Sequence, residues 1–160
     1  MNQHHSPEGK KANKSRMRLI EKSINISASP DVVWSVVVDF ENYRNWNPFV
    51  LWAEGRPVVG ETLKAHIRPP GGKGMTHQPT VMIAEPGRHL QWLGKVAVPG
   101  LFAGRHEFLL EPTAEGTLVR QREEFTGILV PFLGRTLERT EKGFAELNQA
   151  LKEQAEARSN

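Results

Sequence analysis

The feature of this sequence that most constrains its fold is an amphipathic pattern near the C-terminus. After Gly127, bulky apolar residues recur at steps of four, seven, three and four positions, at Leu133, Leu137, Phe144, Leu147 and Leu151. This spacing puts them on one face of a helix and predicts a single long helix that runs to about Ala157. Because such a helix must bury its apolar face, the rest of the chain has to supply a surface for it.

The preceding residues predict that surface to be a sheet. Residues 18–27 alternate between polar and apolar and predict a strand, and residues 49–125 predict a meander of antiparallel strands separated by Gly- and Pro-rich turns. Ser29, Pro30 and Asp31 are typical of a helix N-terminus. We give this signal more weight than the strand propensity of the β-branched residues that follow. A second short helix is expected over residues 39–46, ended by Asn47-Pro48. These elements predict an α+β fold in which a curved sheet surrounds the last helix and leaves an internal cavity.

The positive charge of the chain is concentrated at its N-terminus. Of 21 basic and 18 acidic side chains, four basic and one acidic lie in residues 1–16, which leaves 17 of each in the remainder. We interpret residues 1–16 as a disordered basic tail and residues 17–157 as one ligand-binding domain. The tail is interpreted as solubilising; the alternative is a basic arm that touches phosphates.

Several function classes are disfavoured by what the sequence lacks. It has no cysteine, which excludes disulfides and thiolate chemistry. Its longest apolar run, Val32–Val38, is broken by Ser35 and is too short for a membrane span, and the polar N-terminus does not resemble a secretory signal. We therefore expect a cytoplasmic protein that has no nucleic-acid partner and does not insert into a membrane.

Hairpin arithmetic predicts which side chains share the concave face. Leu90, Trp92 and Val96 form the apolar set of one strand, and Pro79, Val81 and Ile83 form that of the strand before it. The predicted cross-strand pairs are Ile83 with Leu90, Val81 with Trp92, Leu110 with Val119, Phe108 with Gln121, and His106 with Glu123.

This register places a histidine, a glutamate and a glutamine among aromatic side chains. One hypothesis is that His106 and Glu123 form a catalytic acid–base pair, in which the carboxylate orients the imidazole. The alternative is a satisfied polar pair that fixes the register or holds a ligand without chemistry.

The remaining candidates favour no metal site and no cofactor. His66 and His77 flank a hairpin, but the register puts His66 outside and His77 inside, and no metal-binding motif is present. Residues 71–74 are Gly-rich but join two strands, so we expect a mobile flap beside the cavity and not a phosphate loop.

Three groups of residues resemble one known superfamily. They are Ser29–Trp34 with Asp39–Tyr43 and Trp46–Phe49; Glu85-Pro86 followed by Leu90–Trp92; and Gly104–Phe108 with Glu123–Gly127. Their order and spacing resemble START-like (SRPBCC) domains, in particular the polyketide cyclase/dehydrase-like branch. The resemblance implies the helix-grip fold, with about seven antiparallel strands around a long C-terminal helix, two short helices and an internal cavity for apolar molecules. It carries over no universal catalytic set.

We therefore expect the protein to bind a small, largely apolar ligand that is lipid-like, aromatic or polyketide-like. The expected ligand-binding residues are Trp46, Val81, Trp92, Phe108, Gln121, Phe125, Leu137, Phe144 and Leu147. One alternative is a cyclase or dehydratase that uses His106 and Glu123. Another is a protein-interaction module of the co-chaperone type, and the sequence also leaves open a homodimer.

Overall fold

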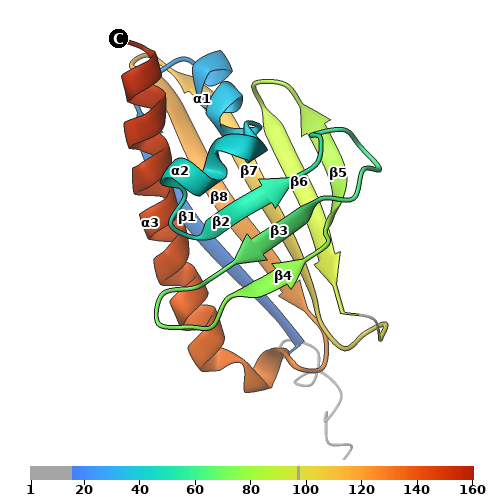
Figure 1. The fold of residues 1–160 in the computed structure, drawn as a ribbon. Coiled ribbons are helices and arrows are strands. Elements are labelled where there is room, and N and C mark those ends of the chain that lie inside the picture. The colour runs from blue at the N-terminus through green and yellow to red at the C-terminus, as the bar shows by residue number, and fades with distance from the viewer. Residues whose placement is uncertain (1–15, 97) are drawn as a thin grey trace, which may run out of the picture.

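The computed structural model describes residues 16–96 and 98–160, which form two antiparallel sheets around a long C-terminal helix (Figure 1). The larger sheet has the order β1 (Met17–Ile26), β8 (Gly116–Thr126), β7 (Ala103–Thr113), β6 (His89–Lys95) and β5 (Thr80–Glu85). The smaller sheet has the order β2 (Val50–Glu54), β3 (Lys64–Ile67) and β4 (Met75–His77). The predicted helix-grip α+β fold is confirmed.

The helices begin and end close to their sequence signals. They are α1 (Pro30–Val37), α2 (Tyr43–Trp46) and α3 (Gly134–Arg158), with 3₁₀ turns at Phe40–Asn42 and Val130–Phe132. At the start of α1 the Ser29 hydroxyl accepts a hydrogen bond from the Val32 amide at 3.3 Å. The cap thus prevails over the strand propensity of the valines that follow.

The sheet has one strand more than the expected seven, and it is divided. Gln78 and Pro79 separate β4 from β5, where a single strand was predicted. Proline has no amide hydrogen to donate to a neighbouring strand, so the ladder is interrupted there. The two sheets remain connected by a bridge between Thr62 and Thr80.

The predicted register holds in one hairpin and only partly in the other. Between β7 and β8 the three predicted pairs are confirmed: Leu110–Val119, Phe108–Gln121 and His106–Glu123. Between β5 and β6, Val81 lies opposite Trp92 as predicted, but Ile83 lies opposite Gln91 and not Leu90. A bulge between Val81 and Ile83 adds one residue to β5 and reverses the faces beyond it.

Two residues predicted to lie on the inner face, Ile83 and Val96, are placed differently in the structure. After the bulge Ala84 takes the place opposite Leu90 and packs against the core. Val96, predicted to be part of the inner apolar set, follows the end of β6 and is 37% exposed. Its inward placement was therefore wrong, because the alternation stops with the strand at Lys95.

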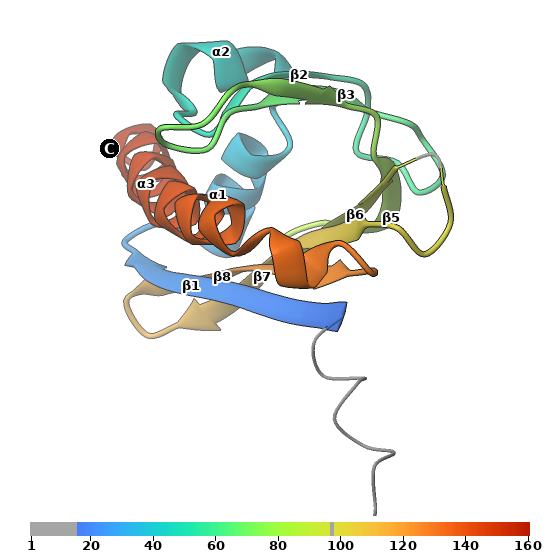
Figure 2. The same ribbon diagram turned by 90° about the horizontal axis from the view of Figure 1, so that it is seen from below.

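The core lies between the two sheets and α3, as the view along the helix shows (Figure 2). The helix contributes one buried face, formed by Leu137, Thr140, Gly143, Phe144, Leu147, Asn148, Leu151 and Ala155. The predicted basic tail lies outside the described residues, except for Arg16. In the described part of the chain, no helix combines the length and apolar character needed to cross a bilayer.

Candidate functional site

His106 lies at the centre of the concave face and is surrounded by aromatic rings. Its ring stacks on Trp92 with centroids 4.8 Å apart and planes 9° apart. Phe144 of α3 meets it edge-on at 5.1 Å, and Phe108 lies at 5.0 Å in a tilted arrangement. The residue is only 3% exposed, so its polar atoms depend on protein or ligand partners.

One ring nitrogen of His106 has such a partner and the other has none. Nδ1 lies 3.4 Å from Oε2 of Glu123, the cross-strand neighbour that the sequence predicted. Nε2 is buried and has no hydrogen-bond partner in the described protein. If Nδ1–H donates to the carboxylate, Nε2 is left as an unprotonated acceptor among the aromatic rings.

A glycine on the neighbouring strand makes room for the Glu123 side chain. A Cβ atom at Gly104 would stand 2.5 Å from Oε1 of Glu123. The Glu123 carboxylate therefore lies over the backbone of Gly104, in the space that a side chain would fill. The Glu123 side chain is 16% exposed, so solvent still reaches this inward-facing group.

Gln121 is the second buried polar side chain on this face. Its Nε2 donates to Oδ1 of Asn148 at 2.7 Å and to the Phe144 carbonyl at 3.3 Å. Asn148 in turn donates to the Lys22 carbonyl at 3.1 Å. The other atom of the amide, Oε1 of Gln121, is buried without a partner.

The sequence analysis did not select Asn148, although a signal was present. It is a polar residue beside Leu147 and one helical turn after Phe144, on the stripe that predicted the helix. A polar side chain in such a stripe calls for a buried partner, and Gln121 on the facing strand is that partner.

His77 brings a third titratable group to the interior. It pairs with the buried Ala65 of β3 and shares its face, as predicted. Burial lowers the pKa of His77, the negative charge of Glu123 partly opposes this, and His66 adds to the lowering. The charge of Glu123 thus influences the pKa of His77, while its carboxylate contacts His106.

His66 lies on the opposite side of the small sheet. It stacks on Trp52 with centroids 5.9 Å apart, and its Nδ1 lies 3.0 Å from the Thr76 hydroxyl. Among residues 16–96 and 98–160 no three His, Asp or Glu side chains are grouped as metal ligands would be.

All nine predicted ligand-binding residues are buried or partly buried. Eight of the nine are buried: Val81, Trp92, Phe108, Gln121, Phe125, Leu137, Phe144 and Leu147. The ninth, Trp46 on α2, is partly buried, packs edge-on against Tyr43 at 5.3 Å, and has a buried Nε1 without a partner. Burial raises the pKa of Tyr43, as does the Asp39 charge, so its hydroxyl remains a donor to the Val37 carbonyl.

Two hollows on the surface of the described residues lie elsewhere. One, of about 650 Å³, is bounded by the start of α1, the β7–β8 turn and the end of α3. The other, of about 610 Å³, lies between the start of α1 and the β5–β6 turn. Neither is lined by a predicted ligand-binding residue, so the cavity between the sheet and α3 stays a prediction.

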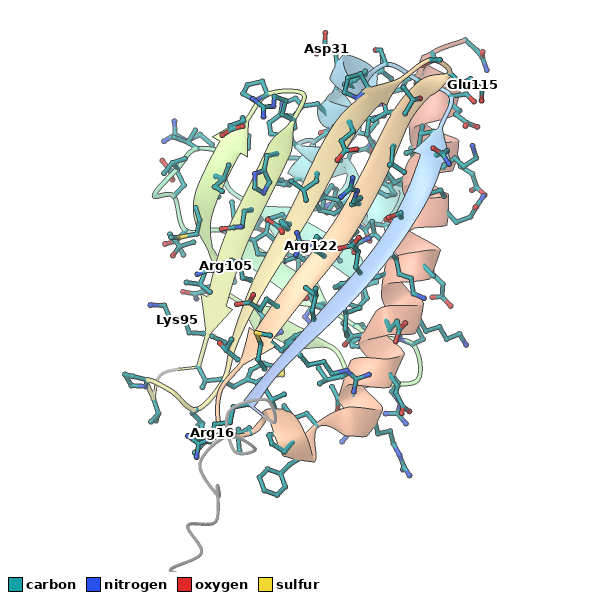
Figure 3. The ribbon with its side chains drawn as sticks, turned by 180° about the vertical axis from the view of Figure 1, so that it is seen from behind. Arg16, Asp31, Lys95, Arg105, Glu115 and Arg122 are labelled. Carbon is teal, nitrogen blue, oxygen red and sulfur yellow. The ribbon has the colours of Figure 1, made fainter. Side chains whose placement is uncertain are left out.

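The outer face of the large sheet carries a separate polar network (Figure 3). Glu107 accepts hydrogen bonds from His89 at 2.7 Å and Gln91 at 2.9 Å and lies 3.4 Å from Arg122, which also contacts Glu21. Burial acts to raise the pKa of Glu107, but these hydrogen bonds and charges outweigh it and lower the pKa. This network joins four strands and faces away from His106.

Comparison with known proteins identifies relatives of the whole fold. Residues 17–156 match the model of a family described as polyketide cyclase / dehydrase and lipid transport. A search of the curated proteins finds no match.

Three solved structures illustrate the likeness. The aromatase/cyclase Zhui from Streptomyces sp. R1128 is 20% identical, with a TM-score of 0.71 over 90% of this chain and 96% of that one. Protein MLL2253 from Mesorhizobium loti is 22% identical, with a TM-score of 0.68 over 89% and 99% of the two chains. The di-domain ARO/CYC StfQ of the steffimycin biosynthetic pathway is 16% identical, with a TM-score of 0.73 over 91% of this chain and 53% of its own. At these identities the likeness establishes the shared fold.

Proposed function

Because the chain belongs to the polyketide cyclase / dehydrase and lipid transport family, we propose that it binds a small, largely apolar molecule between the sheet and α3. In this proposal His106, Gln121 and Glu123 face the polar group of the ligand. The aromatic and aliphatic side chains around them contact its apolar part.

The observation that carries the proposal is the unpartnered Nε2 of His106. A buried polar atom without a hydrogen bond costs about 1–3 kcal/mol, so such atoms are uncommon unless they serve a purpose. Oε1 of Gln121 is a second such atom on the same face of the sheet, opposite Phe108. A ligand with a hydroxyl or carbonyl group would supply the missing partner at either atom.

The apolar surroundings would provide most of the affinity. Phe108, Phe144 and Trp92 present aromatic surface, and Leu137 and Leu147 extend it along α3. Burial of apolar surface contributes roughly 25 cal/mol per Å², which for a lipid-like or aromatic molecule outweighs a few hydrogen bonds. The polar atoms would then select and orient the ligand.

Access is expected from the end of the sheet where α3 begins. Phe102 and Leu133 pack against the core but are only partly buried, and Glu123 is also only partly buried, in contrast to His106 and Gln121 further along. Because the aromatic rings around His106 pack against one another, we expect them to separate when a ligand enters.

Native mass spectrometry of the protein purified without refolding tests for a bound molecule. A second test uses the apolar fluorophore 1-anilinonaphthalene-8-sulfonate, titrated while the tryptophan emission is recorded. Saturable binding with quenching of tryptophan emission is expected, since Trp92 lies in the proposed site. Absence of both a copurified molecule and saturable binding would contradict the proposal.

A catalytic role is the second candidate, and it is favoured by the contact between His106 and Glu123. The carboxylate holds one tautomer of the imidazole, which leaves Nε2 able to accept a proton from a substrate and return it. An aldol-type cyclisation or a dehydration requires such a proton transfer.

The catalytic role is tested with a poly-β-keto thioester analogue and the variants His106→Ala and Glu123→Gln. Loss of turnover in both variants, with fluorophore binding retained, would support the acid–base pair. Turnover that survives both substitutions would remove the pair from consideration.

A further inference from the structure

One end of the molecule exposes a group of large apolar side chains. They belong to the loop between β6 and β7, the segment between β8 and α3, and the start of β1. Their exposed fractions are 37% for Val96, 59% for Val98, 48% for Ile128, 81% for Phe132, 53% for Met17 and 46% for Leu19. We refer to these six residues as the loop-end surface.

Backbone hydrogen bonds hold the three segments together. The Ile128 amide donates to the Gly100 carbonyl at 3.1 Å, and the Leu129 amide donates to the Leu101 carbonyl at 3.2 Å. The Gly127 amide donates to the Arg16 carbonyl at 3.0 Å. The exposed side chains therefore belong to one connected end of the fold, where β1 and α3 begin (Figure 1).

The charges at this end are mostly of one sign. Residues 95–105 contain Lys95 and Arg105 and no acidic residue, and residues 125–137 contain Arg135 and no acidic residue. Arg16 adds a further positive charge beside Gly127. Three carboxylates border these segments: Glu138 follows residue 137, and Glu123 and Glu124 precede residue 125, with Glu124 opposite Arg105 in the β7–β8 ladder.

The opposite end of the sheet has a different character. Figure 3 shows Arg16 and Lys95 at one end of the large sheet and Asp31 and Glu115 at the other. Large exposed apolar side chains and positive charge thus coincide at a single end of the molecule.

This combination favours one kind of partner. A second copy docked on the same face would bring basic groups against basic groups, which is unfavourable. Nucleic acid would match the charge, but aliphatic side chains such as Val98 and Ile128 gain little from phosphates or sugars. An anionic bilayer matches both, because its headgroups attract Lys and Arg while its acyl boundary accommodates apolar side chains.

We propose that the loop-end surface docks onto an anionic lipid bilayer. Phe132 and Ile128 enter the boundary between headgroups and acyl chains, and Lys95, Arg16 and Arg135 face the lipid phosphates. The sequence predicts no membrane insertion; the contact proposed here lies at the bilayer surface and requires no spanning segment. It rests on surface residues alone, so it can hold or fail independently of ligand binding between the sheet and α3.

The test is cosedimentation of the full chain with vesicles of phosphatidylcholine, or of phosphatidylcholine mixed with phosphatidylglycerol. Binding to the mixed vesicles only, weakened by added NaCl, is expected. Phe132→Ser should reduce the affinity for mixed vesicles about tenfold, because it removes one large apolar side chain from the boundary. Since Phe132 is 81% exposed, the variant should keep its fold, as checked by its melting temperature.

Two matched controls distinguish binding through the loop-end surface from nonspecific adsorption to vesicles. Val59→Ser removes a 62% exposed apolar side chain from the loop between β2 and β3 and should leave vesicle binding unchanged. Arg88→Gln, in the β5–β6 turn, should also leave it unchanged, whereas Lys95→Gln combined with Arg135→Gln should weaken it.

Five results would overturn the proposal. Four of them are equal binding to both kinds of vesicle, no binding to either, an equal effect of Phe132→Ser and Val59→Ser, and a vesicle-free dimer that Phe132→Ser dissociates. Binding of a DNA duplex with the same dependence on Phe132 would assign the surface to nucleic acid and would equally overturn it.

Discussion

At the residue scale, the informative property of His106 is that the fold does not need its second nitrogen. Phenylalanine has a similar shape and could stack on Trp92 and meet Phe144 edge-on. It would remove the unpartnered Nε2, whose burial is unfavourable, and Oε2 of Glu123, which would lose its contact with Nδ1, belongs to a side chain that solvent still reaches. The presence of a histidine at this position therefore points to a role outside stability.

We expect His106→Phe to leave the free energy of unfolding unchanged within about 1 kcal/mol, or to raise it, while fluorophore binding weakens about tenfold. Urea unfolding and the fluorescence titration measure the two quantities. His89→Phe is the matched control, since His89 lies on the outer face of the same sheet and bonds to Glu107. A large loss of stability in His106→Phe with unchanged binding would show that the histidine is structural.

Gly104 provides a second test at the same site. An added Cβ would meet the Glu123 carboxylate at 2.5 Å, and the end of a flexible side chain can move away at little cost. Gly104→Ala should therefore displace the carboxylate from His106 and destabilise the fold by only about 1 kcal/mol. The ¹⁵N chemical shifts of the His106 ring, which report its tautomer, should change.

The control for this variant is Gly94→Ala on the neighbouring strand. Gly94 lies opposite Gly104, and a Cβ there would meet no atom closer than 4.0 Å. The same change in ring shifts in both variants would mean that the contact between Glu123 and His106 does not depend on the space at Gly104.

Much of this site could be predicted from the sequence, because strand alternation and a short turn determine a hairpin's register. The His106–Glu123 and Phe108–Gln121 pairs follow from the turn near Gly116. The bond from Gln121 to Asn148 could not be placed the same way, because it joins a strand to a helix. How α3 is rotated against the sheet depends on packing, which sequence periodicity gives only approximately.

At the element scale, the packing of α3 against residues that flank strands of the small sheet depends on one glycine. A Cβ at Gly143 would stand 2.4 Å from Cδ2 of Phe49 and 3.1 Å from Cδ of Pro70. Phe49 in turn meets Phe144 edge-on at 5.4 Å. Glycine normally weakens a helix by about 1 kcal/mol relative to alanine, so its presence here reflects the space that Phe49 occupies.

Gly143→Ala should lower the free energy of unfolding by up to about 2 kcal/mol, because an overpacking cost of about 1–3 kcal/mol opposes a gain of about 1 kcal/mol in helix propensity. Gly134→Ala is the matched control, since a Cβ at this first residue of α3 meets nothing within 4 Å. It should be neutral or stabilising. Thermal and urea unfolding of the two variants measure the difference, and a stabilising Gly143→Ala would contradict the packing argument.

Element types were more predictable than element boundaries. The cap at Ser29 identified α1 correctly, since it outweighed the propensity of several valines. Pro79 divided a predicted strand, and the bulge after Val81 changed the face of Ile83. Bulges leave no reliable mark in a single sequence, because their cause is the curvature that the whole sheet must adopt.

At the scale of the whole molecule, the outer face of the large sheet and the interior between the sheets each hold a titratable group whose pKa is shifted, for different reasons. On the outer face Glu107 has several partners, and its pKa is lowered from 4.5. Inside, burial lowers the pKa of His77 from 6.5 despite the charge of Glu123. As the pH falls, the fold therefore loses stability in two separate pH ranges. The first loss comes from His77 in the interior, and the second comes from Glu107 in the outer network.

The sign of each effect follows from which state binds more protons. Just below pH 6.5 the unfolded chain protonates His77 while the folded protein keeps it neutral, so stability falls as the pH falls toward the folded-state pKa. Glu107 stabilises the fold above pH 4.5, and this contribution is lost as the pH falls through its lowered pKa.

We expect His77→Gln to flatten the fall in unfolding free energy that begins below pH 6.5 and to leave the fall below 4.5 in place. Glu107→Gln should do the reverse, so each variant is the control for the other. Urea unfolding at a series of pH values measures both slopes. If His77→Gln left the upper slope intact, His77 would not be held neutral by the interior.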